Sequence, residues 1–129
     1  AADLGISDRV AFLGTRRDVP AILAMLDVVV LPSRTEGMSN ALLEAMAMAR
    51  PVVATAVGGN VDVVRDRATG RLVPPGDPSS LAGALLELLA HPTAAEALGR
   101  SARAWVAESL SLERMLKRYE NLYRSLVDK

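Results

Sequence analysis

Apolar and polar positions alternate along the chain in a pattern that predicts strands followed by helices. Short, almost uninterrupted apolar runs occupy residues 10–13, 28–31, 52–54 and 71–73, and we interpret each as a β-strand. The run at 28–31 is nearly all β-branched and lacks polar alternation, as is typical of a strand covered on both faces. Helical spacing predicts helices over 19–25, from Ser39 or Asn40 onward, from Asn60 through Val64, and over 80–89, 94–109 and 112–127.

Several helix starts carry residues that can cap them. Asp18, Asn60 and Ser111 are the expected N-caps of the helices that follow them. The last helix is strongly amphipathic, and its apolar face predicts an exposed patch or self-association if nothing buries it. That face consists of Leu112, Met115, Leu116, Tyr119, Leu122, Tyr123 and Leu126.

Alternating strands and helices indicate an α/β fold. We expect a Rossmann-like parallel sheet of about four strands, flanked by helices and followed by an extended C-terminal helical region, in one domain over residues 1–129. Ligands of such sheets bind at the carboxyl ends of the strands. Those ends fall at Gly14, at residues 32–36 and at residues 55–59.

Composition narrows the function classes. The 129 residues are half apolar, and Lys plus Arg balance Asp plus Glu at 15 each, so no basic field favours nucleic acid. Cysteine is absent and His91 is the only histidine, which leaves no thiolate chemistry and no histidine-based metal site. No apolar run approaches the roughly 20 residues of a membrane span. We expect a cytoplasmic protein.

The chemistry is expected in residues 27–54, a strand, loop, helix and strand. Residues 36–40 (Glu36, Gly37, Met38, Ser39 and Asn40) run into a helix, whose free N–H groups and positive dipole end suit a phosphate. Glu44, eight positions after Glu36, would lean back toward the same crevice and could accept hydrogen bonds from the cis-diol of a ribose. The alternative is that both glutamates are ordinary solvated acids.

Two further features leave alternatives open. Gly58 and Gly59 either bring a second helix N-terminus to the ligand or form a plain turn. Arg16, Arg17 and Arg34 either meet a diphosphate or lie solvated at the surface. The sequence contains no G-x-G-x-x-G, no G-x-x-x-x-G-K-[ST] and no G-x-S-x-G, so dinucleotide-binding, P-loop and serine-hydrolase readings lack their motifs.

The residues resemble a known family. The ordered segments are LPSRTEGMSNALLEAMAMARPVVATAVGGN, TGRLVPPGDP and SLERMLKRYENLYRSL. Together they resemble the C-terminal donor-binding domain of retaining GT-B glycosyltransferases of family 4 (group 1), over essentially the whole chain. The centre of the resemblance is the E-x7-E signature, met here by Glu36 and Glu44.

The resemblance implies a nucleotide-diphosphate sugar as donor. Glu44 would hold the ribose hydroxyls, and Glu36 would contact the donor sugar or stabilise the reacting centre. The N–H groups of residues 37–39 would meet the sugar or distal phosphate, with Asn40 beside them. Gly14 and Arg16 match the loop that borders the base. Transfer would retain the anomeric configuration and need neither metal nor cofactor.

The chain departs from the family pattern at turns. Ala49 and Arg67 stand where the family usually has Gly, so Ala49 must either avoid a positive φ or tolerate strain. Val61 replaces a usual Pro and Asp62 a usual Glu.

The larger departure is truncation at the N-terminal side. The family's acceptor domain is missing, as are the first two βα units of its donor domain, which carry an Arg and a Lys for the diphosphate. In the family's 3-2-1-4-5-6 strand order, the four remaining strands are expected to close up as 3-4-5-6.

Three hypotheses follow from the resemblance and the truncation. The first is a piece of a sugar transferase that is inactive alone and reaches its acceptor through the missing domain. The second is a non-catalytic nucleotide-sugar binding or interaction module completed by another chain. The third is a βα protein without a ligand.

Overall fold

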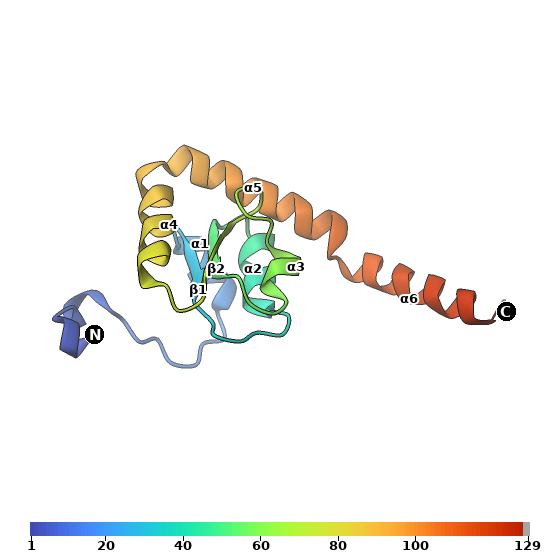
Figure 1. Cartoon of the computed structure of the whole chain (residues 1–129), viewed down its shortest axis with the longest axis horizontal. Helices are drawn as coiled ribbons and strands as arrows, with labels where there is room; N and C mark the ends of the chain where they lie inside the picture. The colour runs from blue at the N-terminus through green and yellow to red at the C-terminus, as the bar shows by residue number, and fades with distance from the viewer. Residues whose placement is uncertain (128–129) are drawn as a thin grey trace.

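A computed structural model describes residues 1–127 of the chain (Figure 1). Two short 3₁₀ helices open it, and strands then alternate with helices before three helices end it. In chain order the elements are η1 (Ala2–Leu4), η2 (Ser7–Arg9), α1 (Val19–Met25), β1 (Val29–Leu31), α2 (Asn40–Ala47), β2 (Val52–Thr55), α3 (Asn60–Val63), β3 (Arg71–Val73), α4 (Pro78–Ala90), α5 (Pro92–Ser109) and α6 (Leu112–Val127). This order confirms the predicted α/β class.

The strands form one parallel sheet in the order β1-β2-β3. Val29 lies opposite Val52 in the first pair, and Val53 lies opposite Arg71 in the second. Parallel neighbours require crossover connections, which α2 and α3 supply. The carboxyl ends of β1 and β2 therefore meet at one edge of the sheet.

Residues 10–13 form no strand, so the prediction that four strands lie side by side in one sheet is wrong. They are exposed, with Phe12 at 86%, and they lie in an N-terminal segment that runs outside the sheet (Figure 1, blue). An apolar run becomes a strand only where a neighbour completes its hydrogen-bond ladder, and none of residues 1–127 pairs with this one. The sheet of the described residues has three strands, and β1 is its edge.

The core lies on both faces of β2, which is buried throughout. Val52 and Ala54 pack on α2, α3 and α5, while Val53 faces α4. This alternation follows from the two-residue period of a strand. Helix α5 contributes Ala102 to the first layer and Ala95 to the second, so it ties the two faces together (Figure 1).

Helix caps were predicted with mixed success. The Ser39 hydroxyl accepts a hydrogen bond from the Leu42 N–H at 3.3 Å, which confirms the expected start of α2. The Ser111 hydroxyl accepts one from the Arg114 N–H at 3.4 Å, as expected of a cap.

Of the two other predicted caps, Asp18 is right in position only, and Asn60 is wrong. Asp18 occupies the cap position of α1, but its side chain pairs with Arg16 and caps nothing. Asn60 is the first residue of α3 and is fully buried, and the cap position before it belongs to Gly59. Asn60 instead donates its side-chain amide to the Thr55 carbonyl at 3.0 Å.

Both residues that replace a family glycine adopt positive φ, 54° at Ala49 and 61° at Arg67. A Cβ in this region costs roughly 1–2 kcal/mol per residue. Ala49 therefore tolerates strain where the chain leaves α2. Its carbonyl lies so close to Gly99 of α5 that any side chain there would collide with it.

We predict that Ala49→Gly raises the free energy of unfolding by about 1 kcal/mol, because the released strain exceeds the added chain entropy. Urea denaturation followed by circular dichroism measures this change. The matched control is Ala47→Gly, which lies within α2 and should lower stability by about 1 kcal/mol. Equal destabilisation by both variants would contradict the strain at Ala49.

Candidate functional site

The candidate site lies at the carboxyl ends of β1 and β2. The loop of residues 32–38 leaves β1 and enters α2, and residues 56–59 connect β2 to α3. This edge is where parallel α/β sheets bind ligands. It brings Glu36, Gly37, Met38, Ser39 and Asn40 together in one continuous stretch.

Glu36 is half-buried in the loop after β1. The Ser33 hydroxyl donates a hydrogen bond to its Oε2 at 3.0 Å, so one carboxylate oxygen is held by the chain. The other, Oε1, has no hydrogen-bond partner within residues 1–127. Glu36 can therefore accept a hydroxyl from a bound molecule without giving up its contact with Ser33.

Gly58 and Gly59 hold this loop by backbone contact. A Cβ at Gly58 would collide with the Glu36 carbonyl oxygen, and one at Gly59 with the Gly37 carbonyl oxygen. The Gly59 N–H donates to that Gly37 carbonyl at 2.8 Å. The sequence left open whether these glycines bring a second helix N-terminus to the ligand or form a plain turn. Neither alternative describes them fully, because the loop that carries Glu36 packs directly against their backbone.

The start of α2 offers donors for an anion. Ser39 is buried and its hydroxyl is used in capping, whereas Gly37, Met38 and Asn40 are exposed. The backbone N–H groups of residues 37–39 donate no hydrogen bond in the described part of the chain. Together with the positive end of the helix dipole, these groups suit a phosphate oxygen.

Glu44 lies on the exposed side of α2. Its neighbours Leu42, Ala45 and Met46 face the core, and the Glu44 side chain forms neither a hydrogen bond nor an ion pair with any described residue. Side chains of a helix lean toward its N-terminus, so Glu44 extends along α2 in the direction of residues 37–40. Its carboxylate is free to bind two neighbouring hydroxyls.

Gly14 and Arg16 are not joined to this loop. Both lie in the exposed N-terminal segment, and the Arg16 guanidinium donates two hydrogen bonds to Asp18, at 2.9 and 2.7 Å. This contact lowers the pKa of the Asp18 carboxyl from its ordinary value. Arg17 and Arg34 are exposed, and no ion pair involves them within residues 1–127.

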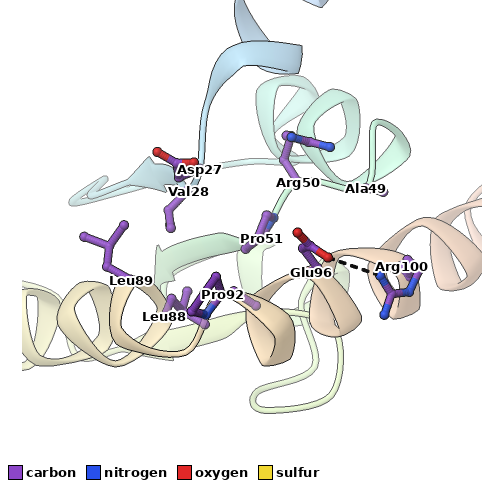
Figure 2. A pocket seen from close by; sticks show the side chains of 11 residues that line it. Asp27, Val28, Ala49, Arg50, Pro51, Leu88, Leu89, Pro92, Glu96 and Arg100 are labelled. Atoms are coloured by element: carbon purple, nitrogen blue, oxygen red, sulfur yellow. Dashed lines mark ion pairs between the residues drawn. The ribbon is translucent and has the colours of Figure 1, made fainter.

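A hollow of about 460 Å³ opens at the opposite edge of the sheet (Figure 2). Asp27 and Val28 line it just before β1, Pro51 just before β2, and the turn between α4 and α5 closes it. Its Glu96 and Arg100 pair with each other at 3.8 Å. Because it lies at the amino ends of the strands, it is separate from Glu36.

Two searches of residues 1–127 were negative. No group of three or more Asp, Glu or His side chains is arranged to hold a metal ion. No helix is both long and apolar enough to cross a membrane.

Comparison with known proteins identifies the family. Residues 1–91 match the family described as "Glycosyl transferases group 1". The chain belongs to this family. The predicted resemblance to the group 1 glycosyltransferases is therefore confirmed.

Its relatives are considerably longer proteins. N-acetyl-alpha-D-glucosaminyl L-malate synthase of Bacillus anthracis is 37% identical over 94% of this chain and 32% of its own length. D-inositol 3-phosphate glycosyltransferase of Salinispora tropica is 40% identical over 98% of this chain and 27% of its own length. The chain thus spans about a third of the length of the curated relatives it matches.

Solved structures agree on the GT-B fold. Sucrose-phosphate synthase of Thermosynechococcus elongatus superposes with a TM-score of 0.89 at 35% identity, over 98% of this chain and 32% of that one. HepE of Anabaena, solved in complex with UDP-glucose, superposes with a TM-score of 0.88 at 27% identity, over 96% of this chain and 34% of the HepE chain.

Sequence reasoning missed three side chains of the site, Ser33, Thr55 and Asn60. Ser33 holds Glu36, Thr55 ends β2, and Asn60 had been interpreted as a cap. A usable signal was present, because polar residues directly after or at the end of neighbouring parallel strands must meet at one edge.

We predict that Gly58→Ala destabilises the fold by about 3 kcal/mol, because a methyl group would collide with the Glu36 backbone at a position of positive φ. Thermal unfolding measures the loss, and amide NMR spectra should show the largest changes near residues 36–37. Gly83→Ala is the matched control, since nothing lies within 4 Å of that position in α4. It should stabilise by about 1 kcal/mol. A Gly58→Ala protein as stable as the parent would disprove the close approach.

Proposed function

We propose that this chain is the donor-binding part of a glycosyltransferase that uses a nucleotide-diphosphate sugar. The observation that carries the proposal is the arrangement at one sheet edge of a half-buried carboxylate, free N–H groups at a helix start and a second, unpartnered carboxylate on that helix. Each of these groups matches a different part of such a donor.

The diphosphate is assigned to the start of α2. The N–H groups of residues 37–39 and the helix dipole would attract the phosphate nearest the sugar. When the bond between the sugar's anomeric carbon and the phosphate oxygen breaks, the diphosphate leaves with the bonding electrons. The same N–H groups would stabilise the negative charge that develops on it.

The ribose is assigned to Glu44, whose carboxylate can accept hydrogen bonds from two adjacent hydroxyls. Glu36 is assigned to the donor sugar, with Oε1 free and Oε2 held by Ser33. The acceptor oxygen would then form its bond to the anomeric carbon on the face the diphosphate has left, giving retention, and pass its proton to the departing phosphate oxygen. We assign no metal or cofactor to these steps.

Structures of relatives support this class of donor. HepE has been solved with UDP, with UDP and glucose, and with UDP-glucose, and TarM of S. aureus with UDP. The names of the curated relatives specify different sugars and acceptors, including L-malate, inositol phosphate and lipopolysaccharide core. We therefore propose the donor class and no particular sugar.

We further propose that the isolated chain does not turn over. Within residues 1–127, Arg16 is paired with Asp18, and the only lysine, Lys117, belongs to α6. The cationic groups for the diphosphate are expected from the first two βα units of the family's donor domain, and the acceptor site is expected from the family's N-terminal domain. A non-catalytic module completed by another chain is the alternative, and acceptor turnover on adding those units and that domain would decide against it.

The proposal predicts that Glu44→Ala weakens binding of UDP about tenfold or more, because a charged acceptor of two ribose hydroxyls is lost. Isothermal titration with UDP, GDP and ADP measures the effect and the base preference. Glu96→Ala is the matched control, an exposed helical glutamate outside the site, and should bind as the parent does.

Dideoxy-UDP, which lacks both ribose hydroxyls, makes this test specific. The parent should bind dideoxy-UDP more weakly than it binds UDP. The Glu44→Ala variant should bind the two nucleotides with equal affinity. If the parent binds UDP and dideoxy-UDP equally, the ribose assignment is wrong.

We also propose that α6 associates with a second copy in solution. The helix projects from the rest of the chain (Figure 1), and the side chains of its apolar face are exposed. Between that face and the start of α2 lies an apolar groove of about 350 Å³, lined by Met38, Leu43, Met115, Tyr119 and Leu122. An exposed apolar surface of this extent marks an interaction site.

The association predicts that Tyr119→Glu with Leu122→Glu converts dimers into monomers, because two charges would enter the apolar contact. Sedimentation velocity measures the mass of each species. Lys117→Glu, on the polar side of α6, is the control and should leave the mass unchanged. A parent that is monomeric at high micromolar concentration refutes self-association.

A further inference from the structure

A chain of three hydrogen bonds leads from the buried helix α3 to the carboxylate of Glu36. The Asn60 Nδ2 donates to the Thr55 carbonyl at 3.0 Å. The Thr55 hydroxyl donates to the Ser33 carbonyl at 2.6 Å, and the Ser33 hydroxyl donates to Glu36 Oε2 at 3.0 Å. These residues come from three separate elements that meet at the carboxyl ends of β1 and β2.

The inner half of this chain is shielded from water. Asn60 is 0% exposed and Thr55 is 5% exposed, so water does not compete for the bond between them. The Thr55 hydroxyl also lies 3.4 Å from the Leu31 carbonyl, but its shorter contact is the part-buried one with the Ser33 carbonyl. A buried hydrogen bond of this kind is costly to lose, because the group left behind has no substitute partner. Thr55 therefore fixes where the Ser33 backbone lies, and Ser33 in turn reaches Glu36.

Residues 55–60 hold the loop on both sides of Glu36. On one side the Thr55 hydroxyl binds the Ser33 carbonyl, and on the other the Gly59 N–H binds the Gly37 carbonyl at 2.8 Å. Both anchors belong to residues 55–60. With the backbone held at two points and Oε2 held by Ser33, the carboxylate presents Oε1 in one direction.

We infer that Ser33, Thr55 and Asn60 are positioning residues that fix the direction in which Glu36 presents its free oxygen to the donor sugar. The inference rests on the proposed function, because it requires Glu36 to contact that sugar. A role only in holding β1 next to β2 would need the Thr55 hydroxyl but would give no reason for Ser33 to bind the carboxylate.

Two readouts on the full chain test the inference, with Ser33→Ala and Thr55→Val as the variants. One is the ratio of affinities for UDP-glucose and UDP, which isolates the sugar contact from the ribose and phosphate contacts. The other is the carbon-13 resonance of the Glu36 carboxyl group at constant pH, which needs no ligand. Both variants should lower the ratio roughly fivefold, equivalent to one hydrogen bond of about 1 kcal/mol, and should shift the resonance.

Conservative variants separate positioning from general loss of structure. Thr55→Ser keeps the hydroxyl and should restore both readouts, while Ser101→Ala, which removes an exposed hydroxyl on α5, should change neither. Ser33 is only half-buried, so Ser33→Ala is expected to fold even if Thr55→Val does not.

The outcomes are distinguishable. If Glu36→Gln lowers the affinity ratio but Ser33→Ala and the folded Thr55→Val leave both readouts unchanged, the inference is overturned and the proposed function stands. If Glu36→Gln leaves the ratio unchanged, the assignment of Glu36 to the sugar fails, and the inference falls with it.

Discussion

The backbone contact between residues 36–37 and residues 58–59 is the constraint on which the site depends. Two loops that leave neighbouring strands lie so close that neither Gly58 nor Gly59 has room for a Cβ. The approach removes freedom from the loop before α2, so the N–H groups at the helix start and the Glu36 carboxylate keep a fixed relation. A looser contact would leave the same residues present without a common geometry.

The central strand makes this contact possible. All four residues of β2 are buried, because α4 covers one face and α2, α3 and α5 cover the other. The partly buried Trp105 side chain adds to this arrangement by donating a hydrogen bond from α5 to the Val63 carbonyl of α3 at 2.9 Å. Packing on both faces fixes where β2 ends, and the end of β2 fixes residues 55–60.

Much of this fold could be predicted from periodicity alone. The apolar runs at 28–31, 52–54 and 71–73 became strands because each found a neighbour in the sheet. The run at 10–13 is also apolar but pairs with no strand among residues 1–127, and a local pattern does not show whether a strand will find a neighbour. Asn60 failed as a cap for a different reason, since it is the first residue of α3 and its side-chain amide donates to the Thr55 carbonyl five residues earlier, at the end of β2.

Those residues of the candidate site whose type suggests their chemistry could be predicted from the sequence. Those whose contacts depend on how the loops pack could not. Glu36, Glu44 and the start of α2 could be found from the sequence, since carboxylates and a loop entering a helix are visible there. The predicted sheet edge already contained Ser33 and Thr55, but which hydroxyl there contacts which acceptor depends on the path of the two loops, and the sequence pattern does not show that path.

Glu36 and Glu44 differ in burial and in their hydrogen bonds, and this difference is consistent with the separate roles proposed for them. Glu36 is half-buried, hydrogen-bonded and placed on a loop anchored at two points, whereas Glu44 is exposed and has no partner among the described residues. A group near a reacting centre gains from being fixed, because misplacement there costs rate directly. A group that holds hydroxyls far from the bond being broken needs only to be charged and within reach. The structural contrast therefore fits Glu36 as the residue nearer the transferred sugar and Glu44 as the nucleotide anchor.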